Sequence, residues 1–214
     1  MVEALARGIL IRVLVILLLA IIGLMAYYLL VTGSNPAAKG IPWTKPGMVF
    51  EYSDGYTYIV KSASEDNVEM VVVNETANGD IERLKYLIGK LGYKIINIDP
   101  SEGYLYFVKG IDESSIIKAF KQKDIEIKSI KLIADISNNY SKIVDSEIGV
   151  RKVRVYSLEL GGENLEGEIR IHVDRELKVI VYIEGLMHFK KENLSVAIAV
   201  SLMRYYTIDT GILN

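Results

Sequence analysis

The sequence predicts an α+β fold, in which an N-terminal transmembrane helix precedes antiparallel sheets that include a ferredoxin-like βαββαβ unit. Three observations predict it. Residues 13–31 contain no charged side chain. Residues 67–134 alternate between strand-like and helix-like apolar periods. Residues 135–214 contain several runs of alternating apolar and polar residues, separated by turn residues, which indicates a β-meander.

Residues 13–31 are the predicted membrane span. They include seven Leu, three Ile and three Val, and at 1.5 Å per residue they cover about 28 Å, close to the thickness of a hydrocarbon core. Arg7 and Arg12 flank the near end, so the positive-inside rule places the N-terminus in the cytoplasm. Residues 1–33 are therefore expected to be a cytoplasmic stub and a signal-anchor helix. The bulk of the chain would be extracytoplasmic, at the cell membrane.

Two other interpretations of this stretch stay open. A cleaved signal peptide would normally have an apolar region of about 7–15 residues, and this one is longer. A buried core helix would need apolar partners on every side. The uncleaved single-pass anchor is favoured over both.

Composition excludes several classes of function. The net charge is −2, and a chain without a basic excess gives no support for nucleic-acid binding. The absence of Cys excludes disulfides, thiol catalysis and Cys-based metal sites. A single Gln, Gln122, together with abundant Ile, Lys and Glu resembles the usage of thermophiles. An archaeal source in a hot environment is a hypothesis from composition alone.

Three sequons for N-linked glycosylation occur, and they begin at Asn74, Asn139 and Asn193. Used sequons would fit an exported glycoprotein, because the acceptor must lie on an exposed segment. Chance occurrence is the alternative interpretation.

Residues 34–45 are expected to be a linker, because they contain Pro36 and Pro42 and no periodic apolar pattern. Residues 46–66 are expected to form an N-terminal β-hairpin. The Asp54-Gly55 pair between two apolar runs is a strong signal for such a turn.

Residues 67–134 form the predicted ferredoxin-like unit. Its elements in chain order are strand 68–73, helix 81–91, strands 93–98 and 104–108, helix 112–123 and strand 125–133. Asp80 can cap the first helix and Gly92 can end it. Pro100 presets the turn between the two middle strands.

Residues 135–214 are the predicted β-meander. Alternation over 153–160, 169–173 and 179–183 indicates an antiparallel sheet with one solvated face. The last segment, 194–206, alternates strictly and is expected to be a strand, with a buried helix as the alternative.

The meander and the final residues 205–210 resemble uncharacterised archaeal single-pass exported proteins and the half-barrel sheets of bacterial lipoprotein carriers. Those half-barrels bind lipid or peptide on a concave apolar face, so the resemblance implies a similar binding surface. The chain departs from that pattern in two ways. It has no Cys for lipidation, and the helical pair within 80–123 has no counterpart there.

No catalytic, cofactor or metal-binding motif stands out. His172 and His188 are the only two histidines, and metal or His-based sites usually need clustered ligands. His172 and Asp174 are the best local pair, but alternation places His172 on an exposed polar face, and His188 is expected in a loop. The strand tyrosines are expected to pack the sheet, with a Tyr-lined groove for glycan or peptide as the alternative.

The function predicted from these features is a non-enzymatic interaction or assembly module, anchored to the membrane and acting as an accessory subunit of a cell-envelope complex with protein partners. Two alternatives are a carrier-like protein for lipid or peptide and an envelope hydrolase built on dispersed acidic residues, for which His172 and Asp174 are the one local candidate pair. No cofactor is predicted for any of them.

Overall fold

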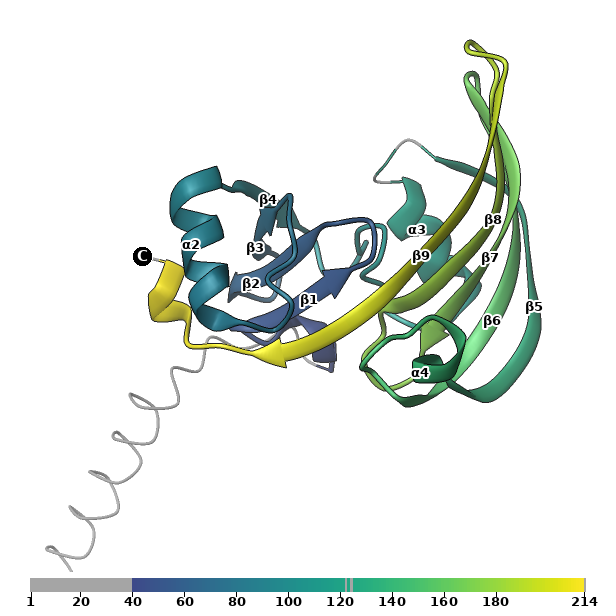
Figure 1. Cartoon of the computed structure of the whole chain (residues 1–214). Coiled ribbons are helices and arrows are strands. Elements are labelled where there is room, and N and C mark those ends of the chain that lie inside the picture. The colour runs from purple at the N-terminus through teal and green to yellow at the C-terminus, as the bar shows by residue number, and fades with distance from the viewer. Residues whose placement is uncertain (1–39, 122, 124, 214) are drawn as a thin grey trace, which may run out of the picture. The chain divides into compact units, whose positions relative to one another are not determined.

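The structure is a computed structural model that describes residues 40–121, 123 and 125–213. It is built around one antiparallel sheet of nine strands (Figure 1). The strand order is β4-β3-β2-β1-β9-β8-β7-β6-β5. The strands are β1 Met48–Tyr52, β2 Thr57–Ala63, β3 Val68–Val73, β4 Lys94–Ile98, β5 Glu126–Asn139, β6 Val150–Gly161, β7 Leu165–Asp174, β8 Ile180–Phe189 and β9 Leu194–Thr207.

Short helices cover parts of both faces of this sheet. They are η1 Pro42–Thr44, α2 Ile81–Leu91, α3 Glu113–Lys121, α4 Tyr140–Ile143 and η2 Thr210–Leu213. The buried side of α2, with Leu84, packs in one cluster with Val49 of β1. Phe50, the next residue of β1, belongs to a second cluster together with Ile116 of α3. Because successive side chains of a strand point to opposite faces, α2 and α3 cover opposite faces of the sheet.

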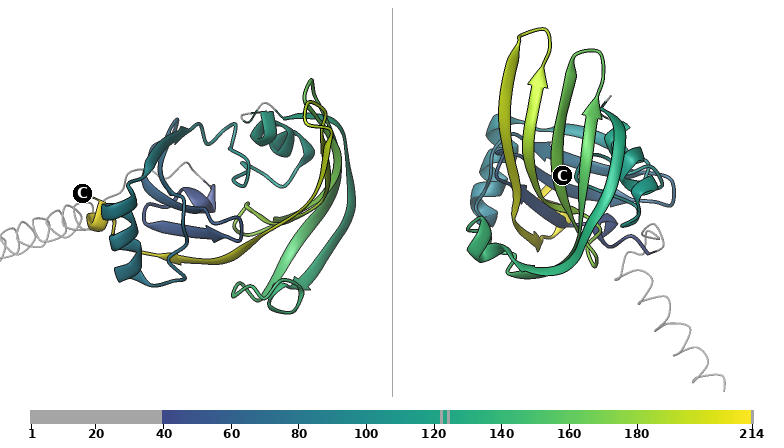
Figure 2. Two further views of the ribbon diagram at one scale, coloured as in Figure 1. Left: turned by 45° about the horizontal axis from the view of Figure 1, so that its top comes forward. Right: turned by 90° about the vertical axis from the view of Figure 1, so that its right-hand side faces the viewer.

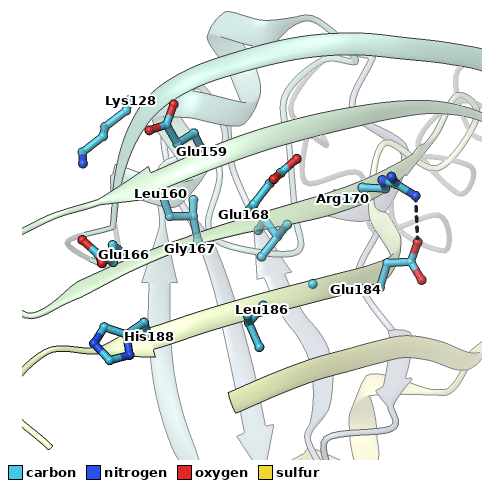
Figure 3. A pocket seen from close by; sticks show the side chains of 12 residues that line it. Lys128, Glu159, Leu160, Glu166, Gly167, Glu168, Arg170, Glu184, Leu186 and His188 are labelled. Atoms are coloured by element: carbon cyan, nitrogen blue, oxygen red, sulfur yellow. Dashed lines mark ion pairs between the residues drawn. The ribbon is translucent and has the colours of Figure 1, made fainter. Parts of the chain in front are cut away.

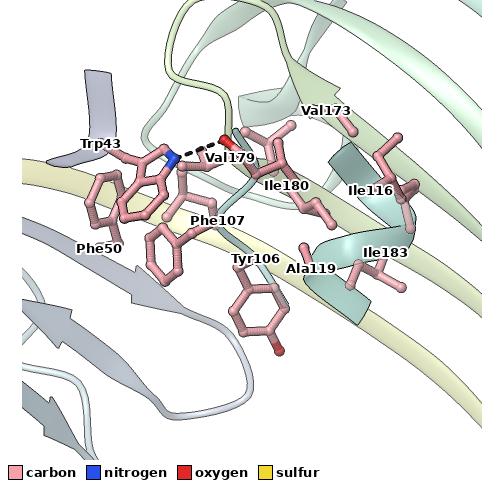
Figure 4. Close-up of a cluster of buried hydrophobic side chains, with 14 of the residues drawn as sticks. Trp43, Phe50, Tyr106, Phe107, Ile116, Ala119, Val173, Val179, Ile180 and Ile183 are labelled. Carbon is pink, nitrogen blue, oxygen red and sulfur yellow. Dashed lines mark hydrogen bonds between the residues drawn. The ribbon is translucent and has the colours of Figure 1, made fainter. Parts of the chain in front are cut away.

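The larger core surrounds Phe107, which is fully buried in the loop before α3 (Figure 4). Its ring lies 5.2–5.3 Å from the rings of Trp43, Phe50 and Tyr58. Trp43 is also fully buried, and its indole nitrogen donates to the Val108 carbonyl oxygen at 2.9 Å. The loop before α3 therefore acts as a core element, and together with α3 it covers the nearer part of the concave side of β6–β9 (Figure 2).

The predicted ferredoxin-like unit is wrong. Strand β3 does pair with β4, but β5 lies at the opposite edge of the nine-stranded sheet and pairs with β6. Residues 104–108 form no strand; Tyr104 and Phe107 close a tight loop by one isolated bridge. The aromatic residues of this loop look like a strand in the sequence because both a strand and a core-filling loop need large apolar side chains.

The predicted single-pass architecture is also wrong for the part of the chain that the structure describes. None of the helices formed by residues 40–121, 123 and 125–213 has the length and apolar character that crossing a bilayer requires. Helix α2 has eleven residues, so it spans about 16 Å, roughly half a hydrocarbon core. The segment that motivated the prediction, residues 13–31, lies outside the described residues. For the described residues, the same finding contradicts the predicted single-pass topology and membrane localisation.

Other predicted elements are confirmed. The N-terminal hairpin is present as β1 and β2, paired antiparallel. Helix α2 begins after Asp80, whose carboxylate accepts from the backbone N–H groups of Glu82 and Arg83 at 2.9 and 3.1 Å. The meander is present as β6–β9, and the ambiguous last segment is strand β9.

Candidate functional site

Strands β7, β8 and β9 extend beyond the part of the sheet that α3 covers (Figures 1 and 2). Their outermost paired residues form a row across the three strands, in which Leu165 lies opposite Phe189 and Phe189 lies opposite Leu194. The turns that connect β6 to β7 and β8 to β9 lie just beyond this row. The row is therefore at the free end of the long strands.

The side chains of this row point to the same face as the core. Ile171 and Ile183 are paired and buried, and residues two apart on a strand share a face. Every second residue outward along the strands from these two, and the residues paired with them on β9, therefore lie on the same face as Ile171 and Ile183. The apolar residues among them form a set that we call the distal apolar face. Its members are Leu165, Met187, Phe189, Leu194, Val196 and Ile198.

The distal apolar face is only partly covered. Met187 and Ile198 pack against the edge of the core and are half-buried. Phe189 and Val196 are also half-buried, and Leu194 is 52% exposed. Contiguous apolar side chains that stay open to solvent are uncommon in a monomer and mark surfaces that bind other molecules.

Two glycines bend the sheet at the start of this region. A Cβ atom on Gly167 would lie 2.4 Å from the carbonyl oxygen of Leu186, and one on Gly185 would lie 2.3 Å from that of Glu168. Neighbouring strands can approach this closely only where no side chain intervenes. The glycines thus allow the curvature that leaves the distal apolar face on the concave side.

The opposite, outer face of the same strands is charged and hollowed (Figure 3). The hollow has a volume of about 820 Å³, and its lining includes Glu159, Glu166, Glu168, Arg170 and Glu184. Arg170 lies 3.9 Å from Glu184, and Lys190 lies 3.2 Å from Glu166. These exposed pairs form a solvated surface and contribute little to stability.

The two histidines take different places from those predicted. His188 lies in β8, not in a loop, and its Nδ1 lies 3.1 Å from the Ser195 hydroxyl on β9. Glu166 is its partner on the other side, on β7. A Ser-His-Glu row of this kind would need donors for an oxyanion, but the backbone groups of these strands pair with each other. The row is also exposed on the outer face, so it is a surface ladder.

His172 is buried, not exposed as predicted. Its Nδ1 lies 2.6 Å from the Tyr140 hydroxyl, and its ring contacts Tyr182 edge to face at 5.3 Å. Burial lowers the pKa of His172 below its ordinary value. The alternation pattern missed this burial because α4 and the following loop cover the outer face at this point.

Asp174 has a structural role. Its carboxylate is fully buried and accepts from the Arg151 guanidinium at 2.5 and 3.1 Å. The same carboxylate accepts from the backbone N–H groups of Glu176 and Leu177 at 2.8 and 2.7 Å, which closes the β7–β8 turn. His172 and Asp174 therefore each have other partners, and no nucleophile lies between them.

Tyr52 of β1 and Tyr58 of β2 pack in the core as predicted, whereas Tyr106 packs there from a loop and Tyr56 is exposed. The Tyr52 and Tyr106 rings stack with centroids 4.1 Å apart, and both side chains are buried. The Tyr106 hydroxyl donates to Asp54 at 2.7 Å. Burial is the main cause that raises the pKa of Tyr106 and of Tyr52 above the ordinary value.

The three sequons lie in different surroundings. Asn74 is exposed just after β3, and Asn193 is exposed in the turn between β8 and β9. Asn139 is half-buried, and its side chain accepts from the Ser141 N–H at 3.2 Å as the cap of α4. Glycosylation of these residues stays a prediction.

Comparison of the chain with family models, with curated proteins and with solved structures finds no match. The sequence contains the alternation that produces the distal apolar face, but not the information that α3 stops short of covering it.

Proposed function

We propose that this chain is a non-enzymatic interaction module, which binds a partner protein through the distal apolar face. The observation that carries the proposal is the row of Leu165, Phe189 and Leu194 across three strands, beyond the cover of α3. Burying such side chains in an interface is favourable by about 25 cal/mol per Å² of apolar surface.

The surroundings of the row suit a protein interface. Stable interfaces have an apolar centre and a polar, solvated rim. Beyond the row, the β8–β9 turn carries Lys190, Lys191 and Glu192, and the β6–β7 turn carries Glu163. A partner with an apolar surface of its own would complete the layer that α3 leaves unfinished.

A carrier-like protein for lipid or peptide is the second candidate. The curvature at Gly167 and Gly185 favours it, because a concave apolar face can hold an elongated apolar ligand. Against it, the nearer part of the concave side is already filled by Phe107 and α3. The hydrolase alternative has the least support, since His172 and Asp174 serve the core and a turn.

The test compares two lysine substitutions on opposite faces of the sheet, one on β9 and one on the neighbouring β8. Leu194→Lys changes the distal apolar face, whereas Leu186→Lys is its matched control on the outer face, where Leu186 is 54% exposed. We expect Leu194→Lys to abolish recovery of a stoichiometric partner in affinity purification from the native source, and Leu186→Lys to retain it. A photo-crosslinking residue at position 194, but not at position 186, should attach to that partner.

Recovery of the same partner by both variants would contradict the proposal. Mass spectrometry of organic extracts from the purified chain separates the two candidates. A defined lipid or peptide that is present in the wild type and absent from Leu194→Lys, without a protein partner, would favour the carrier.

A further inference from the structure

Residues 140–149 connect β5 to β6 by way of the outer face of the sheet, and we call them the strap (Figure 1). The strap begins and ends at the β5–β6 edge, where Asn139 pairs with Val150. Its middle is bonded to β9, because the Ser146 hydroxyl donates to the Leu202 carbonyl oxygen at 2.6 Å. Since β7 and β8 lie between β6 and β9 in the sheet, the strap covers them from outside.

The buried histidine of β7 lies directly under the strap. His172 is 8% exposed, and its Nδ1 lies 2.6 Å from the hydroxyl of Tyr140, which is fully buried at the start of the strap. Val155 lies opposite His172 on β6 and is buried in the same cluster as Tyr140. Two residues along β7 on the same face, the side chain of Arg170 is 61% exposed. The burial of His172 therefore depends on the strap.

Burial is the main influence on the protonation of His172. It lowers the pKa of His172, whereas Glu184 acts in the opposite direction and Arg170 in the same direction. A proton on the ring is therefore costly while the strap is closed, and this cost disappears once water reaches the ring. The other titratable groups on the elements packed around the ring are Tyr140 of α4, Tyr182 of β8, Asp174 of β7 with its partner Arg151 of β6, and the exposed Lys142, Asp145 and Glu147 of the strap.

We propose that the strap is an acid-opened flap, which lifts from the outer face in mildly acidic solution and uncovers Val153 and Val155. Its bonds to β9 can be exchanged for bonds to water, because they join a hydroxyl and a backbone N–H to carbonyl oxygens and the exposed Glu147 to Arg204. Protons bind the open form more tightly than the closed form, so a falling pH shifts the equilibrium toward the open form. This device lies on the outer face and is independent of the distal apolar face.

The experiment uses the absence of Cys from the chain, because one introduced thiol then reports on one position. In Val155→Cys the thiol lies under the strap. Val173→Cys is the matched control, since Val173 is equally buried but belongs to the opposite face of the sheet. The measured quantity is the rate at which a disulfide reagent labels the folded chain, divided by its rate with the denatured chain at the same pH.

Between pH 7.5 and pH 5.5 we expect the relative rate of Val155→Cys to rise by up to about tenfold, because His172 with a pKa of about 6.5 binds a proton in the open form. Low concentrations of urea should not change this rate, since a local opening exposes little surface. Val173→Cys should be labelled more slowly, and its rate should increase steeply with urea. Adding His172→Gln to Val155→Cys should remove the rise with acid.

Three results would overturn the proposal. They are a relative rate of Val155→Cys that is the same at both pH values, an equal rise when His172→Gln is present, and labelling of Val155→Cys that is as slow and as dependent on urea as that of Val173→Cys. Circular dichroism shows whether each variant is folded. If one is not, hydrogen exchange of the wild type gives the same test at the Glu147 N–H, which donates to the Met203 carbonyl oxygen at 2.8 Å. Its protection, corrected for the intrinsic exchange rate, should fall with pH, and constant protection would contradict the flap.

Discussion

The concave side of β7–β9 has two parts with the same alternation of apolar residues, but one part is buried and the other is partly open to solvent. Near α3, Ile171 and Ile183 alternate with polar residues and are buried. Farther out, Leu165 and Phe189 continue the same alternation on the same strands, yet they stay partly open to solvent. The difference lies in what covers the strands, and it shows that an apolar strand face has no fixed role until a second layer is placed on it.

The largest expected effect is at the covered part. Phe107→Ala should lower the free energy of unfolding by about 3–5 kcal/mol, because it removes the ring that fills the space among Trp43, Phe50 and Tyr58. Urea denaturation of the purified chain measures this change. A loss of less than about 1 kcal/mol would mean that the loop before α3 is not part of the core.

The second effect concerns the covered part of the outer face. Asp174→Ala should cost about 3 kcal/mol, since it leaves the Arg151 guanidinium, which is 12% exposed, without its main counter-charge. Glu176→Ala is the matched control, because Glu176 contacts the same guanidinium at 3.3 Å but is 71% exposed. Thermal unfolding should show a change within about 0.5 kcal/mol for the control. Equal losses in both variants would contradict a special role of the buried pair.

The third effect depends on pH. Burial lowers the pKa of His172 in the folded chain below its unfolded value of about 6.5. As the pH falls through this unfolded pKa, the unfolded chain binds a proton that the folded chain resists, so the folded state becomes less stable toward lower pH. Denaturation midpoints between pH 7 and pH 5 should therefore decline, and His172→Gln should decline less steeply. His188→Gln, in the open part of β8, should follow the wild type.

The smallest effect on stability is expected at the open part. Phe189→Ala should lower the free energy of unfolding by about 1 kcal/mol, well below the effect of Phe107→Ala, because Phe189 is only partly buried whereas Phe107 is fully buried. The comparison with Phe107→Ala is the direct test of the difference between the two parts. A loss as large as that of Phe107→Ala would show that the distal apolar face is a core in its own right.

Much of the local structure could be predicted from the sequence. The alternation of Leu194, Val196 and Ile198 was enough to predict strand β9, and the Asp80 cap with its apolar period was enough for α2. The burial of His172 could not be predicted, because it depends on Tyr140 of α4, which approaches from outside the strand. The distal apolar face could be read as apolar, but not as uncovered.

By itself the sequence determined the periods, turns and caps of the strands and helices, because these depend on neighbouring residues. The order of the strands was decided only in the tertiary structure. The pattern of residues 67–134 fits a four-stranded unit as well as it fits two separate edges, β4 and β5, of a larger sheet. The choice depends on which distant strands provide hydrogen bonds and apolar contacts, and on where α2 and α3 find faces to cover. For the same reason, only the tertiary structure leaves Leu165, Phe189 and Leu194 beyond the last covering helix.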